Sequence, residues 1–322
     1  MVRLLSPDER PLRHPPVAPS PGRPIVQIVR QQPGLPDLAD LVDRLCPSVA
    51  VIVPHGLDVT SEADGTAVVP ASAYSADGWL VTSAAELPPM PLDAVFGDGR
   101  RVNLVDQRKD PVSGLAIVKA ETTVAPLTFS DQTFPRVGQF GMAITTAIGS
   151  GCSAAVSMIG SDFLADGGSG VGYFRLRPAP DDWTAGTPLV AADGQVVGIG
   201  TDAPLGALIP APIASVILDE LIRNSLSAST KFGFRTIDYA APFSSRLGDF
   251  RSGAGVAIVQ AKSSAEKAGL QAGDVITTVD GHPISSASEL SRLLDAASSK
   301  VTLTVKRRSE QVQLAIKRST NS

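Results

Sequence analysis

The hydrophobic residues of this chain fall into short runs separated by Gly, Asp and Pro, from position 49 to about position 200. Runs of this length, bounded by turn-forming residues, are typical of β-strands. The predicted strands are Val49–Val53, Trp79–Thr82, Ala94–Phe96, Ala116–Lys119, Gly141–Thr145, Ser153–Ile159, Gly172–Arg177, Leu189–Val190 and Val196–Gly200. Many short strands in succession indicate a mainly β fold, either an antiparallel sandwich or a pair of barrels.

Several other segments have helical spacing. Leu38–Leu45 predicts a short helix before the first strand, and Ile213–Asn224 predicts an amphipathic helix that closes the β unit. After the polar connector Ser225–Thr230, the chain has its own strands and turns again, which indicates a second domain of small size. Its helices are predicted at Ser263–Gly269 and Ser288–Ala297, each with a serine available as an N-cap.

Residues 1–36 are rich in proline and poor in large apolar side chains. We therefore expect an extended arm, which is either a tail without a role or a docking segment. Met1–Arg30 also lacks the apolar run of about 7 to 15 residues that marks a secretory signal, which favours a chain that is not addressed for export. The predicted division is an arm at 1–37, a β domain at 38–226 and a second domain at 227–322.

Composition excludes several classes of partner. The chain has 322 residues and a formal net charge of -4, so it has no basic field to neutralise phosphates, which argues against nucleic acid as a partner. No apolar stretch approaches the roughly 20 residues that a bilayer-spanning helix needs, so we predict no membrane span.

The two cysteines, Cys46 and Cys152, cannot form a tetrahedral metal site by themselves, and no CxxC pair or histidine cluster adds to them. We therefore predict no metal and no other cofactor. A single disulfide would fit an oxidising compartment. The favoured interpretation is two reduced, buried thiols.

Several stretches resemble one known family. Cys46–Ala50 resembles the first barrel strand of HtrA-type proteases, and Ala76–Thr82 resembles the turn and strand that lead to their catalytic histidine. Asp110–Lys119 resembles the segment of the catalytic acid, and Thr184–Ile199 resembles the nucleophile loop and its hairpin. Over residues 42–318 the chain is similar to an HtrA-type serine protease with one PDZ domain, which implies a trypsin-like double β-barrel followed by an α+β PDZ domain.

The resemblance places the histidine, acid and serine of the catalytic triad at Ala85, Gly114 and Ala185. A serine hydroxyl reacts at neutral pH only when an oriented base takes its proton, and these three residues supply no hydroxyl, base or carboxylate. Trp183 and Thr187 also stand where the family has glycines that shape the loop and present amide donors to an oxyanion. The pattern predicts a pseudoprotease, which means no enzyme and no catalytic residues.

Few side chains are available to replace the missing groups. His14 lies in the arm, His55 follows the first strand and His282 lies in a turn of the second domain, so none is expected near the nucleophile loop. Thr184 and Thr187 carry hydroxyls beside the aligned serine position. They leave open a serine-type endopeptidase with a rebuilt active site.

The second domain keeps the features of a peptide-binding PDZ domain. Lys231–Phe234 resembles the loop whose backbone amides hold a terminal carboxylate, and Ser288–Ala297 resembles the helix beside the binding strand. A bound C-terminus would run along Phe234–Ile237, with its last, hydrophobic side chain against leucines of the helix. The predicted peptide-binding residues are Lys231, Phe232, Gly233, Phe234, Ile237, Leu290, Leu293 and Leu294.

Three functions follow from these observations. The favoured one is a catalytically inactive HtrA-like scaffold or regulator that binds an extended peptide or a protein C-terminus with a hydrophobic last residue. The second is an HtrA-family endopeptidase with a rebuilt site, and the third is a regulatory subunit that binds an active HtrA-type paralogue or another copy of this chain. The resemblance implies the bacterial periplasm or envelope, whereas the visible N-terminus suggests the cytoplasm.

Overall fold

The structure is a computed structural model, and it describes residues 38–57, 68–130, 134–147, 151–161, 163–165, 172–180, 183–201, 206–238, 252–297 and 299–318. The proline-rich arm predicted at 1–37 lies outside the described residues. Residues 36–322 form one compact unit. Among the described helices, none is long and apolar enough to cross a membrane.

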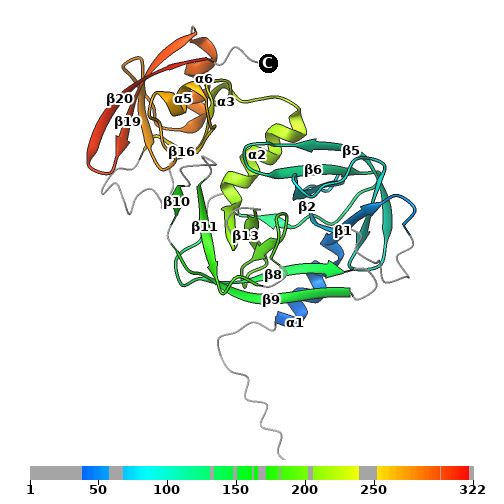
Figure 1. Cartoon of the computed structure of the whole chain (residues 1–322). Coiled ribbons are helices and arrows are strands. Elements are labelled where there is room, and N and C mark those ends of the chain that lie inside the picture. Colours follow the sequence, from blue (N-terminus) through cyan, green and yellow to red (C-terminus); the bar gives the residue numbers. More distant parts are fainter. Residues whose placement is uncertain are drawn as a thin grey trace, which may run out of the picture. The chain divides into compact units, whose positions relative to one another are not determined.

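The first strands of the chain close into a barrel (Figure 1). They are β1 (Val49–Pro54), β2 (Val69–Ala73), β3 (Trp79–Ser83), β4 (Leu92–Phe96), β5 (Arg101–Lys109) and β6 (Leu115–Ala120). Around the barrel they follow the order β1-β2-β3-β6-β5-β4. Because successive side chains of a strand lie on opposite faces, alternate residues such as Ile52, Leu80 and Phe96 point inward and are buried together.

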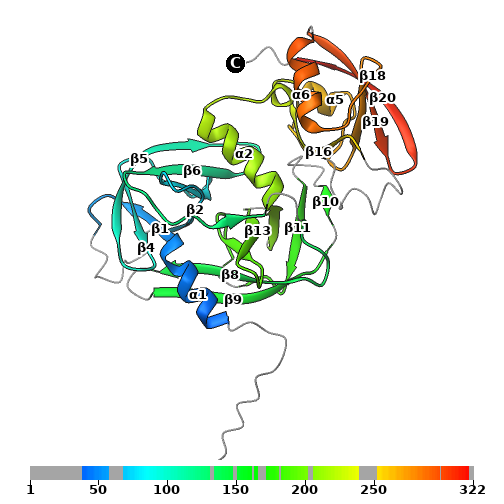
Figure 2. The same cartoon turned by 180° about the vertical axis from the view of Figure 1, so that it is seen from behind.

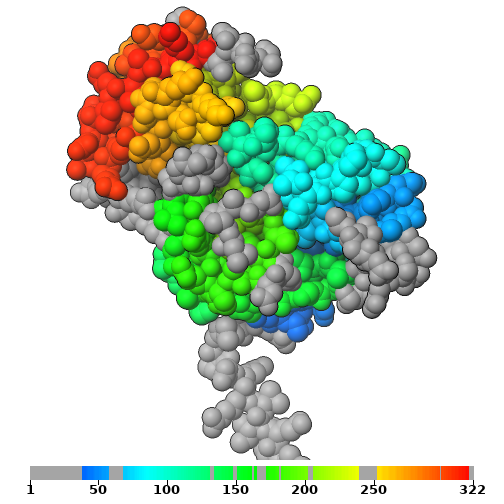
Figure 3. Space-filling view, viewed as in Figure 1, coloured from blue at the N-terminus to red at the C-terminus, as the bar shows by residue number. Residues whose placement is uncertain are grey.

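A second sheet of eight strands follows. Its strands are β7 (Thr128–Phe129), β8 (Phe140–Ala147), β9 (Gly151–Ile159), β10 (Leu164–Ala165), β11 (Gly172–Arg177), β12 (Pro188–Val190), β13 (Gln195–Gly200) and β14 (Ala207–Pro210). The order is β10-β11-β14-β13-β12-β8-β9, and an additional pairing of β11 with β9 brings the two ends of this path together. Figure 3 shows residues of the first barrel, in blue and cyan, beside those of the second sheet, in green.

Two helices flank the barrels. α1 (Leu38–Leu45) lies beside β8 and β9 in both views, and a short 3-10 helix, Cys46–Ser48, leads from it into β1 (Figure 2). α2 (Ala211–Arg223) follows β14 and buries Ile213, Ile217 and Leu218 in the largest apolar cluster. The amphipathic helix predicted at 213–224 is therefore present, and it begins two residues earlier because Pro212 suits a first helical turn.

The last part of the chain is a smaller domain with a six-stranded sheet. Its elements are α3 (Ala228–Lys231), β15 (Phe234–Asp238), β16 (Ala254–Val259), α5 (Ser264–Lys267), β17 (Val275–Val279), β18 (His282–Pro283), α6 (Ala287–Ala296), β19 (Lys300–Arg307) and β20 (Glu310–Lys317). The sheet order is β15-β16-β17-β19-β20, so β15 is an edge strand. α6 packs against β15, β16 and β17, and Ser286 caps it by accepting a hydrogen bond from the Glu289 amide.

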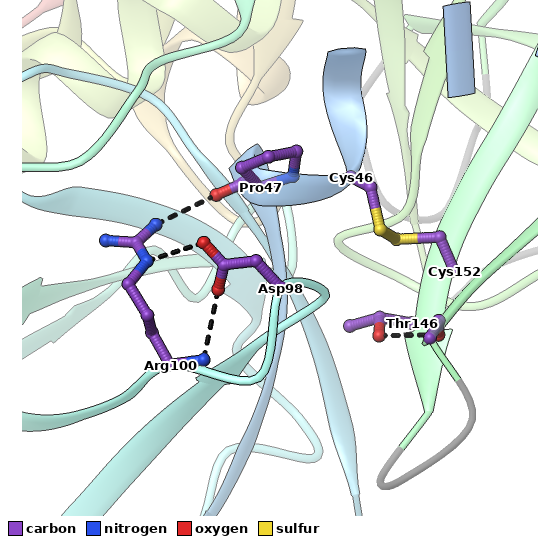
Figure 4. The surroundings of a disulfide bond; sticks show 7 residues. Cys46, Pro47, Asp98, Arg100, Thr146 and Cys152 are labelled. Atoms are coloured by element: carbon purple, nitrogen blue, oxygen red, sulfur yellow. Dashed lines mark hydrogen bonds and ion pairs between the residues drawn. A yellow bond between two sulfur atoms is a disulfide. The ribbon is translucent and has the colours of Figure 1, made fainter. Parts of the chain in front are cut away.

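The two cysteines form a disulfide in this structure, with their Cα atoms 5.8 Å apart (Figure 4). The bond joins the 3-10 helix before β1 to β9, and Gly97 makes room for it: a Cβ on Gly97 would lie 2.5 Å from the Cys152 sulfur and 2.6 Å from the Cys46 sulfur. The favoured prediction of two reduced thiols is therefore wrong. Sequence alone could not decide it, because the residues are 106 positions apart.

Candidate functional site

The three segments that align with a catalytic triad lie beside the first barrel. Ala85 follows β3 and Gly114 precedes β6, and the Ala84 amide donates to the Gly114 carbonyl at 2.7 Å. The loop that contains Ala185 approaches the first barrel at Gly186, whose carbonyl accepts a hydrogen bond from the Ser72 hydroxyl at 3.2 Å. The three segments aligned from the sequence therefore all lie beside the end of β3.

Gly186 is needed for this close approach. It has a φ of 87°, and an added Cβ would lie 2.9 Å from both the Pro70 carbonyl oxygen and the Thr82 Cα. The contacting atoms belong to the backbone and cannot move aside easily. Ala185, the adjacent residue, is only 1% exposed, whereas Ala85 is exposed.

Three amides of this loop donate hydrogen bonds to carbonyl groups within the chain. The Trp183 amide donates to the Pro180 carbonyl at 3.1 Å, the Gly186 amide to Gly200 at 3.1 Å and the Thr187 amide to Thr184 at 3.2 Å. An oxyanion site needs backbone N–H groups that point at the reacting oxygen. In this conformation these three amides donate to carbonyl oxygens of the chain instead.

Two threonine hydroxyls belong to the same loop as Ala185, the position of the aligned serine. Thr184 and Thr187 have their side-chain oxygens 3.4 Å apart, and the Thr201 hydroxyl donates to the Ser113 carbonyl at 3.3 Å. Thr187 is fully buried and Thr184 is partly buried, so Thr184 is the more accessible of the pair. Thr184 is therefore the hydroxyl that a rebuilt site would use most readily.

His55 forms a contact that the sequence did not reveal. Its Nδ1 lies 2.8 Å from Asp93 Oδ1, and Arg101 Nε donates to Asp93 Oδ2 at 2.8 Å. Burial by itself would raise the pKa of Asp93, but the hydrogen bonds from His55 and Arg101 outweigh it and lower that pKa below its usual value. The signal in the sequence was a carboxylate inside the apolar run Leu92–Phe96, since buried charges are usually paired.

Most of the predicted peptide-binding residues gather in the last domain. Phe232, Phe234, Leu290 and Leu294 are buried in one apolar cluster, and Leu293 packs against it while remaining partly exposed. Lys231 is exposed. The structure thus brings these residues together on β15, α6 and the loop before β15.

Ile237 does not join that cluster. It packs with residues of the largest cluster, which also contains side chains of the second sheet and of α2. Strand alternation explains the difference, because residues 234 and 237 point to opposite faces of β15. The side chain of Ile237 therefore points away from the Phe234 cluster, and the part of Ile237 that remains in the predicted peptide-binding strand is its backbone on β15.

The loop before β15 also differs in detail from the predicted carboxylate site. The Phe232 amide donates to Ser229 at 2.9 Å and the Gly233 amide to Thr230 at 2.9 Å, so both close the turn that ends α3. Gly233 has a φ of 88°, and a Cβ there would lie 2.4 Å from the Ser263 Cβ. Glycine at 233 is thus required by the fold itself.

A cavity of about 680 Å³ opens beside this loop. Its lining includes Lys231, Gly233 and Phe234 of the predicted site, and two further cations, Lys262 and Arg318. Arg318 donates to the Leu294 carbonyl at 2.9 Å, while its Nε is buried without a hydrogen-bond partner. The cavity therefore offers positive charge next to the end of β15.

Arg235, beside the predicted peptide-binding residues, forms a buried cluster that sequence reasoning missed. Its guanidinium donates to both oxygens of Asp110, at 2.9 and 3.2 Å, and to Glu220 Oε2 at 2.7 Å. The three side chains are only 6%, 5% and 4% exposed. Burial alone would lower the pKa of Arg235, but the two carboxylates more than offset this and raise it.

The Arg235 cluster joins the two parts of the chain that carry the candidate sites. Asp110 also accepts from the Ser113 amide at 2.8 Å, next to Gly114. Glu220 accepts from the Ser227 amide at 3.1 Å and from the Thr230 hydroxyl at 2.8 Å, immediately before the Lys231–Phe234 loop. One connected hydrogen-bond network therefore runs from the triad-aligned segment to the peptide-binding loop.

Comparison with known proteins supports the resemblance. A PDZ domain family model matches residues 255–307. A Haemophilus influenzae protein named as a probable periplasmic serine protease do/HhoA-like is 32% identical over 211 residues, which is 60% of this chain and 44% of that protein. The periplasmic serine endoprotease DegP of Escherichia coli K12 is 28% identical over 235 residues, or 68% of this chain and 49% of DegP. The chain thus spans about half the length of the curated relatives it matches.

Solved structures agree on the fold. The HtrA-type protease AlgW with a decapeptide matches with a TM-score of 0.54 and 20% identity, covering 88% of this chain and 98% of that one. A serine endoprotease from Yersinia pestis matches with a TM-score of 0.52 and 19% identity, covering 90% and 100%. The predicted mainly β fold, with trypsin-like barrels followed by a PDZ domain, is confirmed.

The same comparisons overturn the prediction that the chain is not an enzyme. The relatives and the structural neighbours are named serine proteases, and no observation on the described residues demonstrates that catalysis is lost. Missing side chains at three aligned positions exclude one way of activating a nucleophile, but not every way. The endopeptidase alternative is the better supported one.

The described residues contain no group of three or more His, Cys, Asp and Glu side chains that could hold a metal ion.

The comparisons and the geometry together lead to one conclusion. By sequence the chain is similar to the HtrA/DegP-type serine proteases, its fold agrees with that of solved HtrA-type proteases, and it carries a PDZ domain that follows the barrels.

Proposed function

We propose that this chain binds extended polypeptides along β15 of its PDZ domain, next to α6. The observation that carries the proposal is that β15 is the edge strand of its sheet, with only β16 paired to it in the described sheet order. An edge strand can pair with an added strand through its free backbone groups. One structural neighbour, the protease AlgW, was solved with a decapeptide, which supports peptide binding by this chain.

The proposed ligand is a C-terminus with a hydrophobic last residue. Its side chain would lie against Leu293 and the apolar cluster behind it. Since the Phe232 and Gly233 amides close the α3 turn, we assign the terminal carboxylate to the cations of the adjacent cavity, chiefly the exposed Lys231 and Lys262. A carboxylate gains charge-assisted hydrogen bonds from such groups.

An array of C-terminal decapeptides, followed by fluorescence anisotropy on the best binder, tests this proposal. Leu293→Glu should weaken binding at least tenfold, while Arg292→Ala, the neighbouring exposed residue, should leave it unchanged. Amidating the peptide C-terminus should weaken binding by a similar factor. Equal affinity for Leu293→Glu and the original protein would refute the proposed location. Gly233 is not a suitable test position, because a larger residue would collide with Ser263.

A second candidate function is peptide hydrolysis at the barrel face, and the names of the relatives favour it. The candidate nucleophile is Thr184, the accessible hydroxyl beside Ala185, and its reaction requires a base that takes its proton, which its described contact with Thr187 does not supply. A fluorophosphonate probe should label the full-length protein at Thr184, and unfolded casein should be cleaved. Thr184→Val should abolish both results, and Thr187→Val serves as the matched control. The absence of labelling and of cleavage in the folded, unmodified protein would refute this second proposal.

We place the protein in the bacterial envelope, as its relatives are periplasmic by name. The Cys46–Cys152 disulfide fits that assignment, because disulfides persist in oxidising compartments. Another copy of this chain, or an active HtrA-type paralogue, is the proposed protein partner. Mixing the purified chain with such a paralogue and measuring casein cleavage tests for a regulatory role.

A further inference from the structure

The cavity beside the loop before β15 has more positive charge than its own carboxylate balances. Its charged lining residues are Asp110, Lys231, Arg235, Lys262 and Arg318. Asp110 is bound by Arg235, and Lys231 lies 3.7 Å from Asp295 of α6. Among the described residues, no carboxylate forms an ion pair with Lys262 or Arg318. These two cations are therefore available to an anionic ligand.

Both cations are held in place by contacts other than ion pairs. Arg318 Nη2 donates to the Leu294 carbonyl at 2.9 Å, whereas its Nε is buried without a hydrogen-bond partner. Because buried polar atoms usually have a partner, an unpaired guanidinium donor beside a cavity points to an acceptor that a ligand supplies. Lys262 has a φ of 63°, which is strained for a residue with a Cβ, and its amide donates to Glu266 Oε2 at 2.6 Å. Strain of this kind clusters at positions that contact ligands.

The same cavity has an apolar side. Leu226, in the connector after α2, is 55% exposed, and Val112 is partly exposed. Ile258 of β16 also lines the cavity, and it belongs to the largest apolar cluster and not to the cluster that contains the leucines of α6. The apolar side of the cavity is therefore separate from the peptide groove proposed beside α6.

We propose that this cavity binds an aliphatic monocarboxylate, such as a medium-chain fatty acid. The carboxylate accepts hydrogen bonds from Arg318 and Lys262, and the aliphatic chain lies along Leu226, Val112 and Ile258. The volume of about 680 Å³ is typical of sites for small ligands. Since the peptide's terminal carboxylate is also assigned to Lys262, the two ligands compete. That competition rests on the proposed function, whereas the fatty-acid site does not.

Isothermal titration calorimetry of the full-length chain with decanoate, below its micelle concentration, tests the site directly. Acetate, which lacks the chain, and 1-decanol, which lacks the charge, should bind at least tenfold more weakly. Lys262→Asn and Leu226→Ser change exposed residues, so both variants should fold, and each should weaken decanoate binding at least fivefold. Asparagine also suits the positive φ at 262. Lys267→Asn, at an exposed lysine that does not line the cavity, is the matched control and should bind decanoate like wild type. Absence of saturable decanoate binding, or equal affinity in wild type, Lys262→Asn and Leu226→Ser, would refute the site.

Competition is measured by fluorescence anisotropy of the labelled decapeptide. Decanoate should displace the peptide from wild type. Leu226→Ser should weaken the binding of decanoate and not of the peptide, and Leu293→Glu should do the reverse. A peptide that stays bound at saturating decanoate would exclude competition. If no peptide binds in any of these proteins, the proposed function fails, and the calorimetric titration still decides the fatty-acid site.

Discussion

Removing the cation from the buried Arg235 cluster should destabilise the protein strongly. Arg235→Met keeps most of the apolar stem but leaves Asp110 and Glu220 buried without their shared partner. Removing one member of a buried ion pair costs about 3–5 kcal/mol, mainly because a charge stays in a poorly solvating environment. With a urea m-value of about 2 kcal/mol/M, the unfolding midpoint should fall by roughly 2 M.

The reasoning can be separated from simple loss of packing. A triple variant, Asp110→Asn with Glu220→Gln and Arg235→Met, removes all three charges, so it should recover a large part of the loss despite carrying more substitutions. Arg292→Met, at an exposed pair, should change the free energy of unfolding by less than about 0.5 kcal/mol. Urea unfolding followed by circular dichroism measures all three. A loss below about 1 kcal/mol for Arg235→Met, or a triple variant less stable than the single one, would show that the cluster does not act as argued.

Two further perturbations test other parts of the structure. The double substitution Cys46→Ser with Cys152→Ser removes a cross-link between residues 106 positions apart. It should lower the free energy of unfolding by up to about 4.7 kcal/mol. A calorimetric melting temperature equal to that of the oxidised protein would contradict the bond. Asp93→Asn tests the lowered pKa of Asp93. In the folded protein this pKa lies below the unfolded value near 3.8. The Asp93 carboxylate therefore stabilises the wild-type protein above about pH 3.8, and this contribution is lost as the pH falls through the folded pKa. The difference in the free energy of unfolding between wild type and Asp93→Asn should therefore be largest at pH 7 and shrink below about pH 4, as urea titrations at each pH would measure. A difference that stays constant with pH would rule out stabilisation of this carboxylate by His55 and Arg101.

Strongly patterned segments could be predicted from the sequence, and weakly patterned ones could not. The helix at Leu38–Leu45 and the strand at Gly172–Arg177 have the bounds that were predicted. β5, at Arg101–Lys109, was missed because Leu104 is its only buried residue, so it has almost no apolar alternation and depends on pairing with β4 and β6. β2 was missed because it is short and contains Pro70, which disfavours a strand assignment.

The residues of the candidate sites also differ in how far the sequence could predict them. Positions 85, 114 and 185 could be aligned with a catalytic triad because each lies in a segment with a distinctive local pattern, and the structure brings Ala84 to Gly114 and Gly186 to Thr82. The partners of Arg235 could not, since Asp110 is 125 positions away and nothing local to a cation states which carboxylate it will meet. Trp183 could be recognised as an unusual residue for its loop, but only the fold shows that its ring turns inward toward Ala207.

The Cys46–Cys152 bond closes a covalent ring that contains all six strands of the first barrel and the start of the second sheet. A single proteolytic nick anywhere between these cysteines, whether by another protease or by the chain itself, would therefore release no fragment. Nicked molecules would migrate as intact protein on a non-reducing gel and separate into two pieces only after reduction, so processing within the ring would be overlooked unless both gels are run.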